Sequence, residues 1–419
     1  MKHMMFGAST LALVAGIANA QDAERTGRAV MATEVLPVSE RMATDHAPIG
    51  IRAGSFLVIP RVELIETFND NIYATSEDEE SDLITSIRPE VAVRSNWNRH
   101  AVNAVAKADI RRYADNKDED HENFLVAADG RVDILRNTSV GGGVSYAQDH
   151  EDRGDPNTIG TPEEPTRFNT TIARIGAYRG VGKANARVDS EVKKLDYEDG
   201  TTAAGTNIDN DVRDRTEYTQ SLRLGYQLTR QFEVFGRGAW DNRVYDNKDV
   251  ARSNNGQTYT VGTSFDISGK TKGEVYGGYM SRSFANNNRD SISDPTFGGK
   301  LTWNATDLTS VIGSVNRGIE ETTLGTSSGF VSTDYDLGVE HALTRDVMLK
   351  SNIGYTNNKY EGAGAQREDD ILVAGAGVDY WLNRCLKAGL SYNFSDRDSN
   401  AVDGDFSRNT VMLRLTATY

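Results

Sequence analysis

The stretch NTVMLRLTATY, residues 409–419, alternates apolar and polar side chains up to its final tyrosine. Its apolar members stand at every second position. They are Val411, Leu413, Leu415, Ala417 and Tyr419. A period of two is typical of a β-strand with one apolar face and one polar face. A soluble sheet over a core and a strand of a membrane barrel both fit this stretch, so the rest of the chain has to distinguish them.

The same alternation recurs from residue 56 onward, and two kinds of break interrupt it. Short breaks such as RNT (136–138) and SGKT (268–271) carry the residues of tight hairpins. Long breaks such as TSEDEESD (75–82) and SDRDSNAVDGD (395–405) are acidic. Short and long breaks alternate strictly along the chain, which predicts about eighteen antiparallel strands whose short turns gather at one end and whose long loops gather at the other.

This sorting of loops is typical of outer-membrane barrels, which have short periplasmic turns and long extracellular loops. Within lipid every backbone amide must be paired, so the sheet has to close. We therefore predict an all-β protein, a transmembrane antiparallel up-and-down β-barrel. Its last strand should pair with the first one, near residues 56–75.

Composition and the N-terminus agree with an exported barrel. The chain has 419 residues, a formal net charge of −15 and 38% hydrophobic residues, and its mean hydropathy is −0.53, too low for a helical membrane protein. Lys2 and His3 precede the apolar stretch MMFGASTLALVAGIANA, which has the features of a secretory signal peptide cleaved after Ala20. Beyond it no apolar stretch reaches the length of a membrane helix. The single cysteine, Cys385, excludes an internal disulfide and is interpreted as filler within a strand.

Three segments follow from these signals. Residues 1–20 are the predicted signal peptide, 21–55 a periplasmic N-terminal extension without sustained period, and 56–419 the barrel. The predicted location is the outer membrane of a Gram-negative cell. The extension is too short for a folded plug domain, which argues against a gated, energy-coupled transporter.

The charged member of each alternating pair should face the lumen, because an Arg or Lys facing lipid at mid-bilayer costs about 2–4 kcal/mol. The acidic residues assigned to this face are Glu90, Asp109, Asp189, Glu191, Glu233 and Asp241. The basic residues are more numerous: Arg88, Arg94, Lys107, Arg111, Arg187, Lys193, Arg223, Arg237, Arg243, Lys350, Lys387 and Arg414. This excess predicts a net positive wall that favours anionic solutes. The alternative is that these charges pair across neighbouring strands and only keep the lumen wet and rigid.

No catalytic or metal site is predicted. Asp149 and His150 are adjacent in an acidic loop, a pairing that a protease could use, but no further carboxylates stand at a recognisable spacing. The six histidines show no metal-ligand spacing. We therefore expect a protein that is not an enzyme and has no cofactor, with a barrel hydrolase or protease as the least favoured alternative.

The stretch GIRAGSFLVIPRVELIETFNDNIYAT (50–75) resembles the start of the putative beta-barrel porin 2 family. The resemblance lies in Gly50, Arg52, Gly54, Pro60, the segment FNDNIYAT and the later strand RPEVAVRSNW (88–97). It implies an outer-membrane barrel of a family often associated with exopolysaccharide or capsule production and proposed to form polymer exit pores. It supplies no catalytic residues.

The leading expectation is thus a pore that lets a secreted anionic exopolysaccharide leave through a basic lumen, and the alternative is a general diffusion porin for small solutes. Expected partners are outer-membrane lipid and lipopolysaccharide, periplasmic polysaccharide-export components, and the barrel-assembly machinery, whose recognition signal the ending Val411 to Tyr419 resembles. No nucleic-acid partner is expected.

Overall fold

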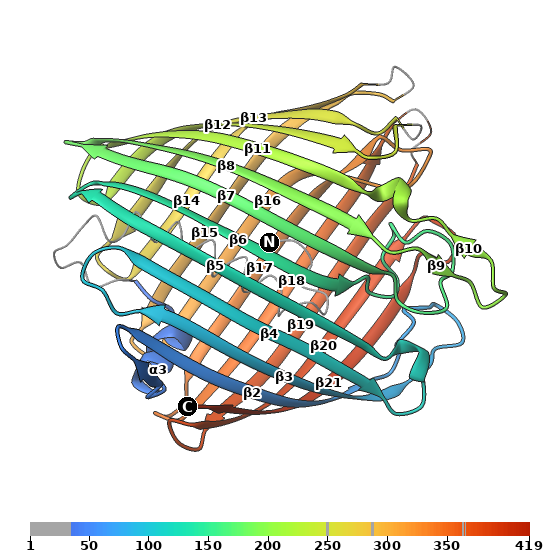
Figure 1. Ribbon diagram of the computed structural model, residues 1–419, viewed down its shortest axis with the longest axis horizontal. Helices are drawn as coiled ribbons and strands as arrows, with labels where there is room; N and C mark the ends of the chain where they lie inside the picture. The colour runs from blue at the N-terminus through green and yellow to red at the C-terminus, as the bar shows by residue number, and fades with distance from the viewer. Residues whose placement is uncertain (1–34, 249–250, 286–288, 363, 365) are drawn as a thin grey trace.

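Eighteen antiparallel strands of 12 to 15 residues close into a barrel (Figure 1). The computed structural model describes residues 35–248, 251–285, 289–362, 364 and 366–419. The barrel strands are β2 (Phe56–Asn69), β3 (Asp82–Ser95), β4 (Ala101–Tyr113), β5 (His121–Leu135), β6 (Thr138–His150), β7 (Arg167–Val181), β8 (Ala184–Tyr197), β11 (Arg215–Gln227), β12 (Phe232–Tyr245), β13 (Asn254–Ile267), β14 (Thr271–Phe284), β15 (Ile292–Thr306), β16 (Thr309–Glu320), β17 (Gly329–Ala342), β18 (Val347–Glu361), β19 (Glu368–Trp381), β20 (Leu386–Ser399) and β21 (Phe406–Thr418). The predicted fold class and strand number are confirmed.

Shorter strands and helices lie before the first barrel strand and in the loops. Strand β1 (Ile51–Ala53) pairs with β2 before the barrel begins. The long loop between β8 and β11 contains the hairpin β9 (Gly200–Thr201) and β10 (Asn207–Ile208) and the short helix η3 (Asp211–Arg213). The other helices among the described residues are α3 (Val38–Asp45) and η2 (Lys117–Glu119). Within the described part of the chain, no helix combines the length and the apolar character needed to cross a membrane.

The seam that closes the barrel joins the two ends of the sheet. Strand β21 pairs antiparallel with β2 from Arg61 opposite Thr418 to Asn69 opposite Thr410. Beyond the last ladder pair, the Tyr419 amide donates a hydrogen bond to the Pro60 carbonyl oxygen, at 3.1 Å. This register confirms the predicted pairing of the last strand with the first, and it leaves the barrel without an open edge at this seam.

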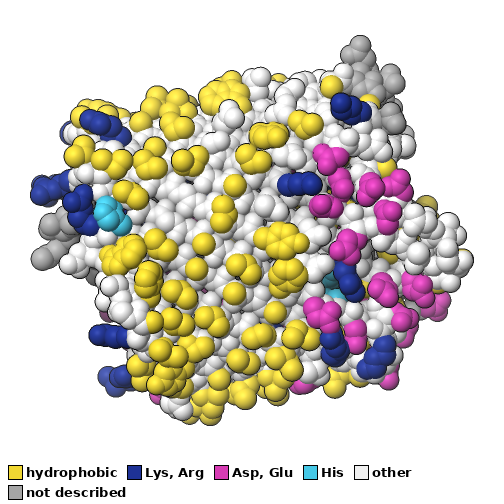
Figure 2. All heavy atoms as spheres, viewed as in Figure 1, with side chains coloured by type: hydrophobic (Ala, Val, Ile, Leu, Met, Phe, Trp, Pro, Cys, Tyr) yellow, Lys and Arg dark blue, Asp and Glu magenta, His cyan; other side chains and the backbone are white. Residues whose placement is uncertain are grey.

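The outer surface carries an apolar belt between two charged ends. Exposed apolar residues recur at every second position, for example Val411 at 42%, Leu413 at 58% and Leu415 at 43% exposure. Figure 2 shows apolar side chains over the middle of the barrel, acidic ones at the end with the long loops and basic ones at the end with the short turns. An apolar belt of this kind suits contact with lipid.

Helix α3 lies inside the mouth at the short-turn end (Figure 1). Val38 and Met42 are buried against Ala342 and Met348, and Trp381 packs on this cluster. The side chain of Met348 faces inward, since side chains alternate along a strand and that of the next residue, Leu349, is exposed on the outer surface. Hydrogen bonds hold the segment to the barrel: Val38 N to Ser310 Oγ (2.9 Å), Ser39 N to Glu340 Oε2 (2.9 Å), Asn304 Nδ2 to Leu36 O (3.0 Å) and one between His46 Nε2 and Asp346 Oδ1 (3.0 Å).

The described part of the extension contains α3 and β1, and the apolar side chains of the helix pack on a surface that exists only in the folded barrel. One expectation is corrected here. Cys385 is exposed in the turn between β19 and β20 and does not lie within a strand. The predicted signal peptide and the cleavage point after Ala20 fall outside the described residues.

Candidate constriction of the lumen

The inner wall of the barrel is charged. The strand register places all twelve predicted basic residues on the inward face, as illustrated by Arg187 beside the exposed Val188 and by Arg414 beside the exposed Leu413. All six predicted acidic residues follow the same alternation.

Most of the basic side chains are paired with carboxylates. Eight of the twelve form ion pairs: Arg88 Nε with Asp109 Oδ1 (2.9 Å), Arg111 Nη2 with Asp109 Oδ2 (2.9 Å), Arg187 Nε with Asp189 Oδ2 (2.8 Å), Arg223 Nη1 with Glu233 Oε1 (2.7 Å), Arg237 Nη2 with Glu274 Oε1 (3.4 Å), Arg243 Nη1 with Glu321 Oε1 (2.6 Å), and Lys350 Nζ (2.8 Å) and Lys387 Nζ (3.8 Å) with Asp379 Oδ2. The pairs of Arg88, Arg223, Lys350 and Lys387 join neighbouring strands. Arg111 and Arg187 pair within their own strands, Arg237 reaches a strand two places away, and Arg243 reaches a loop. Charge pairing therefore describes these eight positions, and the net positive wall stays a prediction. Pairing is favoured because like charges on adjacent strands repel unless carboxylates stand between them.

The partner carboxylates were partly missed from the sequence. Glu274 and Asp379 stand at inward positions of β14 and β19, and the two-residue period would have assigned both to the lumen. Glu321 could not be found in this way, because it comes from a loop and reaches the wall only after that loop folds inward. Strand β17 adds inward acidic residues that also escaped notice, Asp334 and Asp336.

Three arginines form a row across three strands. Arg223 on β11 lies directly opposite Arg187 on β8 and Arg237 on β12. Carboxylates above and below the row compensate it, because Glu233 and Glu274 both approach Arg223, at 2.7 and 3.6 Å. The row is a band of guanidinium groups on the lumen wall, each with donors suited to carboxylate or phosphate.

Two long loops fold into the outer mouth and meet there. The loop at residues 151–166 leaves β6, and the loop at residues 321–328 leaves β16, eight strands further around the ring of eighteen. The Thr323 amide donates a hydrogen bond to Asn157 Oδ1 at 3.1 Å, which joins the two loops. Arg397 on β20 donates to the Gly154 carbonyl oxygen, so the first loop also reaches a third part of the wall. The two loops therefore cross the opening and narrow the path through the lumen.

Buried ion pairs anchor the loop at residues 151–166. Glu151 and Arg213 are only 7% and 4% exposed and form two hydrogen bonds, one of 2.9 Å between Glu151 Oε2 and Arg213 Nη1. Burial raises the pKa of Glu151, and Arg213 opposes this shift. Arg153 Nε binds both carboxylate oxygens of Glu119 at 3.1 and 3.0 Å, and its Nη1 donates to the Pro162 carbonyl oxygen at 2.6 Å.

Glu321 anchors the loop at residues 321–328. Its carboxylate accepts hydrogen bonds from Arg243 Nη1 at 2.6 Å, Tyr245 OH at 3.0 Å and Asn254 Nδ2 at 3.0 Å. Burial alone would raise the pKa of Glu321, but the guanidinium groups of Arg243 and Arg282 hold that pKa below its ordinary value. The loop is thus fixed to the inner wall by a charged, fully hydrogen-bonded carboxylate.

Breaking the Glu151–Arg213 pair should release the first loop. Removing one partner of a buried ion pair costs about 3–5 kcal/mol, because the other charge stays buried without compensation. We expect trypsin to cleave Glu151→Ala after Arg153 and to leave the same bond of the wild type intact. The double variant Glu151→Leu/Arg213→Met, which removes both charges, should restore most of the protection. Equal protection of the wild type and Glu151→Ala would show that this pair does not hold the loop.

The Asp149–His150 pair has a structural explanation. The His150 ring packs on His121, with 3.6 Å between the ring centroids, and its Nδ1 lies 3.6 Å from Asp149 Oδ1. The side-chain amide of Asn123 lies within hydrogen-bond distance of the same nitrogen, which either accepts from Asn123 Nδ2 (3.0 Å) or donates to Asn123 Oδ1 (3.1 Å) according to the tautomer. These contacts tie the end of β6 to β5 at the start of the inward loop, and they account for His150 without a catalytic role.

One acidic cluster was not foreseen. Asp199, Asp209 and Asp211, in the loop between β8 and β11, bring carboxylate oxygens within 4.8 Å of one another, the one such group among the described residues. All three are exposed. Exposed acidic groups of this kind are common without a bound ion, so the cluster assigns no metal site.

Comparison with known proteins gives a family and a set of similar barrels. The profile of the family described as putative beta-barrel porin 2 matches residues 44–419. Similar solved structures include OpdO of Pseudomonas aeruginosa, with 12% identity, a TM-score of 0.46 and coverage of 87% of this chain and 97% of that one. The outer membrane protein opdK of the same organism has 9% identity, a TM-score of 0.47 and coverage of 86% and 99%, and OccAB4 of Acinetobacter baumannii has 10% identity, a TM-score of 0.48 and coverage of 89% and 100%. A comparison with curated proteins found no match.

Proposed function

Because this chain belongs to the putative beta-barrel porin 2 family of outer-membrane barrels, we propose that it is a passive pore for small polar solutes. The observation that carries the proposal is the meeting of the two inward loops at Asn157 and Thr323, which leaves a narrowed path along a charged wall. Such a pore acts by size and by the local field of its lining, and it needs no moving part or energy source. No step in this mechanism is enzymatic.

Exit of a secreted anionic exopolysaccharide is the second candidate. The row formed by Arg187, Arg223 and Arg237 favours it, because these guanidinium groups could exchange their carboxylate partners for those of a passing polyanion. Many weak sites in sequence would let a polymer enter without being trapped. This role requires the two inward loops to move aside, and it would involve periplasmic polysaccharide-export components as partners.

Two further partners belong to the same proposal. The outward face of β21, ending at Tyr419, is proposed as the surface that barrel-assembly machinery recognises. Acidic side chains gather at the long-loop end of the barrel (Figure 2), and lipopolysaccharide is the second proposed partner, with divalent cations bridging its phosphates to these carboxylates.

Ion selectivity in planar bilayers tests the role of the arginine row. The wild type should be weakly selective, since its charges compensate one another. Arg187→Gln/Arg223→Gln/Arg237→Gln should shift the reversal potential in a salt gradient toward cations, and the mirror variant Asp189→Asn/Glu233→Gln/Glu274→Gln should shift it toward anions. Anionic oligosaccharides added on the short-turn side should block the wild type for longer than the triple Gln variant if a polymer passes. Unchanged reversal potentials in both variants would remove the row from the conduction path, and absence of any conductance would overturn both pore candidates.

A further inference from the structure

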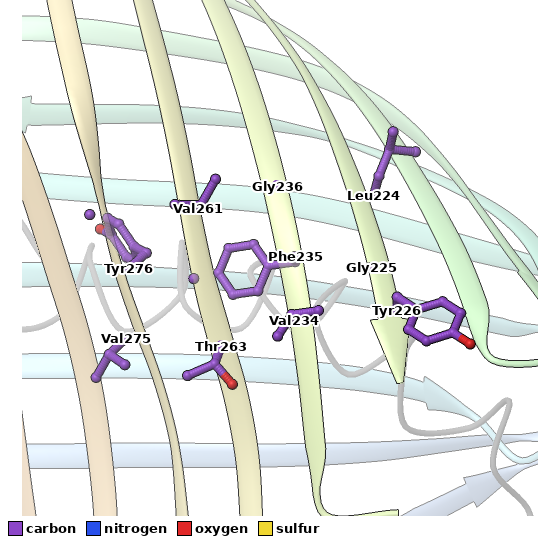
Figure 3. Close-up of a pocket in the computed structure, with 12 residues that line it drawn as sticks. Leu224, Gly225, Tyr226, Val234, Phe235, Gly236, Val261, Thr263, Val275 and Tyr276 are labelled. Carbon is purple, nitrogen blue, oxygen red and sulfur yellow. The ribbon is translucent and has the colours of Figure 1, made fainter. Parts of the chain in front are cut away.

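The lipid-facing side of β11 to β14 contains an apolar hollow of about 810 Å³ (Figure 3). Its walls include Leu224, Val234, Val261 and Val275. These side chains face away from the lumen, with Leu224 55%, Val261 71% and Val275 48% exposed. Tyr226 borders the hollow on the side of the short turns.

Two glycines form the floor of the hollow. Leu224, Gly236, Val261 and Gly277 stand directly opposite one another on four consecutive strands, so they lie in one row on the outer face. Val261 is thus a ridge between two positions without a side chain. Adjacent strands are about 4.8 Å apart, so each glycine leaves a groove about as wide as one hydrocarbon chain.

Packing within the barrel does not require these two glycines. A Cβ added at Gly236 or Gly277 would meet no atom nearer than 4.0 Å, and neither residue has a positive φ. Gly262 differs, since a Cβ there would lie 2.5 Å from a backbone oxygen and 2.6 Å from the Phe235 ring. The sheet therefore needs Gly262, whereas Gly236 and Gly277 determine the depth of the outer hollow.

The hollow lies close to basic turns. Strand β11 ends at Gln227 and β12 begins at Phe232, so Tyr226 and Val234 stand at the short-turn end. With a rise of about 3.3 Å per residue and a strand tilt near 40°, the turn residue Arg230 lies about 10 Å below Val234. Arg230 and Lys270 are both exposed, and the turns 228–231 and 268–270 contain no acidic residue. This distance of about 10 Å between Arg230 and Val234 matches the distance from the head group of a phospholipid to the middle of its acyl chains.

We infer that this hollow binds an anionic diacyl phospholipid of the inner leaflet, with acyl chains over Gly236 and Gly277 on either side of Val261 and its phosphate at Arg230 and Lys270. Charge favours a lipid over a second copy of the chain. Copies side by side in one membrane share their orientation, so a second copy would bring its own basic turns to the same depth, where like charges repel. A phosphate neutralises these turns instead. The inference does not involve the lumen and is independent of the pore proposal.

Native mass spectrometry of the purified, delipidated barrel tests this site with phosphatidylglycerol and phosphatidylethanolamine as probes. The wild type should retain phosphatidylglycerol in preference. Gly236→Leu/Gly277→Leu should lower that binding about tenfold, because the side chains fill both grooves. Arg230→Gln/Lys270→Gln should also lower it about tenfold and leave phosphatidylethanolamine unchanged. Gly313→Leu is the matched control, since Gly313 lies on β16 outside the hollow and a Cβ there meets nothing nearer than 3.9 Å.

Heat-modifiable migration on gels should show that every variant is a folded barrel. Retention of phosphatidylglycerol by a folded Gly236→Leu/Gly277→Leu variant would overturn the assignment, as would equal binding of the two lipids by the wild type. Oligomers of the wild type that Gly236→Leu/Gly277→Leu disperses would identify the face as an interface between copies and equally overturn it.

Discussion

Excision of residues 152–165 is expected to raise the single-channel conductance several-fold. Within this segment the Gly154 carbonyl oxygen accepts a hydrogen bond from Arg397, and Asn157 accepts one from Thr323 of the opposite loop. Removal of the segment should therefore widen the outer mouth. The excision is structurally feasible. The Glu151 amide donates to the Thr166 carbonyl oxygen at 2.8 Å, so the ends of the loop are adjacent and two glycines can join them.

Planar-bilayer recordings provide the measurement. The control is Glu77→Ser/Asp78→Ser/Glu79→Ser, which removes three acidic residues from an exposed part of the loop between β2 and β3 without touching the inward loops. This control should conduct like the wild type. A loop-excised barrel that folds normally and conducts no better than the wild type would show that the constriction lies elsewhere.

Leu413→Arg is expected to destabilise the barrel strongly, whereas Met412→Arg should be tolerated. Leu413 faces lipid in the middle of β21 and is 58% exposed, so an arginine there costs about 2–4 kcal/mol. Met412, one position earlier, points into the lumen between Thr67 and Ser391, where a charge meets water. The pair of variants differs in position by one residue and tests the assignment of the two faces of this strand.

Urea unfolding in lipid vesicles, read out by heat-modifiable migration, measures this difference. Leu413→Arg should lower the unfolding midpoint or the yield of folded barrel, and Met412→Arg should match the wild type. If both variants unfold at the same urea concentration, Leu413 does not face lipid.

The fold followed from local signals. The two-residue period of residues 409–419 and the order of short and long breaks were sufficient to predict the strands, their number and the seam with residues 56–75. The same period placed Arg187 and Arg414 on the inner wall. These features depend only on neighbouring residues, because alternation is a property of each strand and not of the assembled barrel.

The constriction could not be predicted in the same way. Residues 151–166 have no period, and their contacts with Arg397 and Thr323 join positions that are distant in sequence. In the sequence Glu321 does not differ from the other acidic loop residues, and only the folded loop brings it to Arg243 and Arg282. This part of the charge compensation is therefore a tertiary property, whereas the carboxylates on the strands, such as Glu274 and Asp379, follow the two-residue period.

Helix α3 comes early in the chain, yet the surface it needs comes late. Its amides bond to side chains 272 and 301 residues further along, on β16 and β17, and its apolar face packs on β17 to β19. While the C-terminal half is still outside the membrane, the helix has no partner. The helix can therefore dock only after these strands have inserted into the membrane. A slow final phase of refolding should correspond to the packing of α3 against β16 to β19.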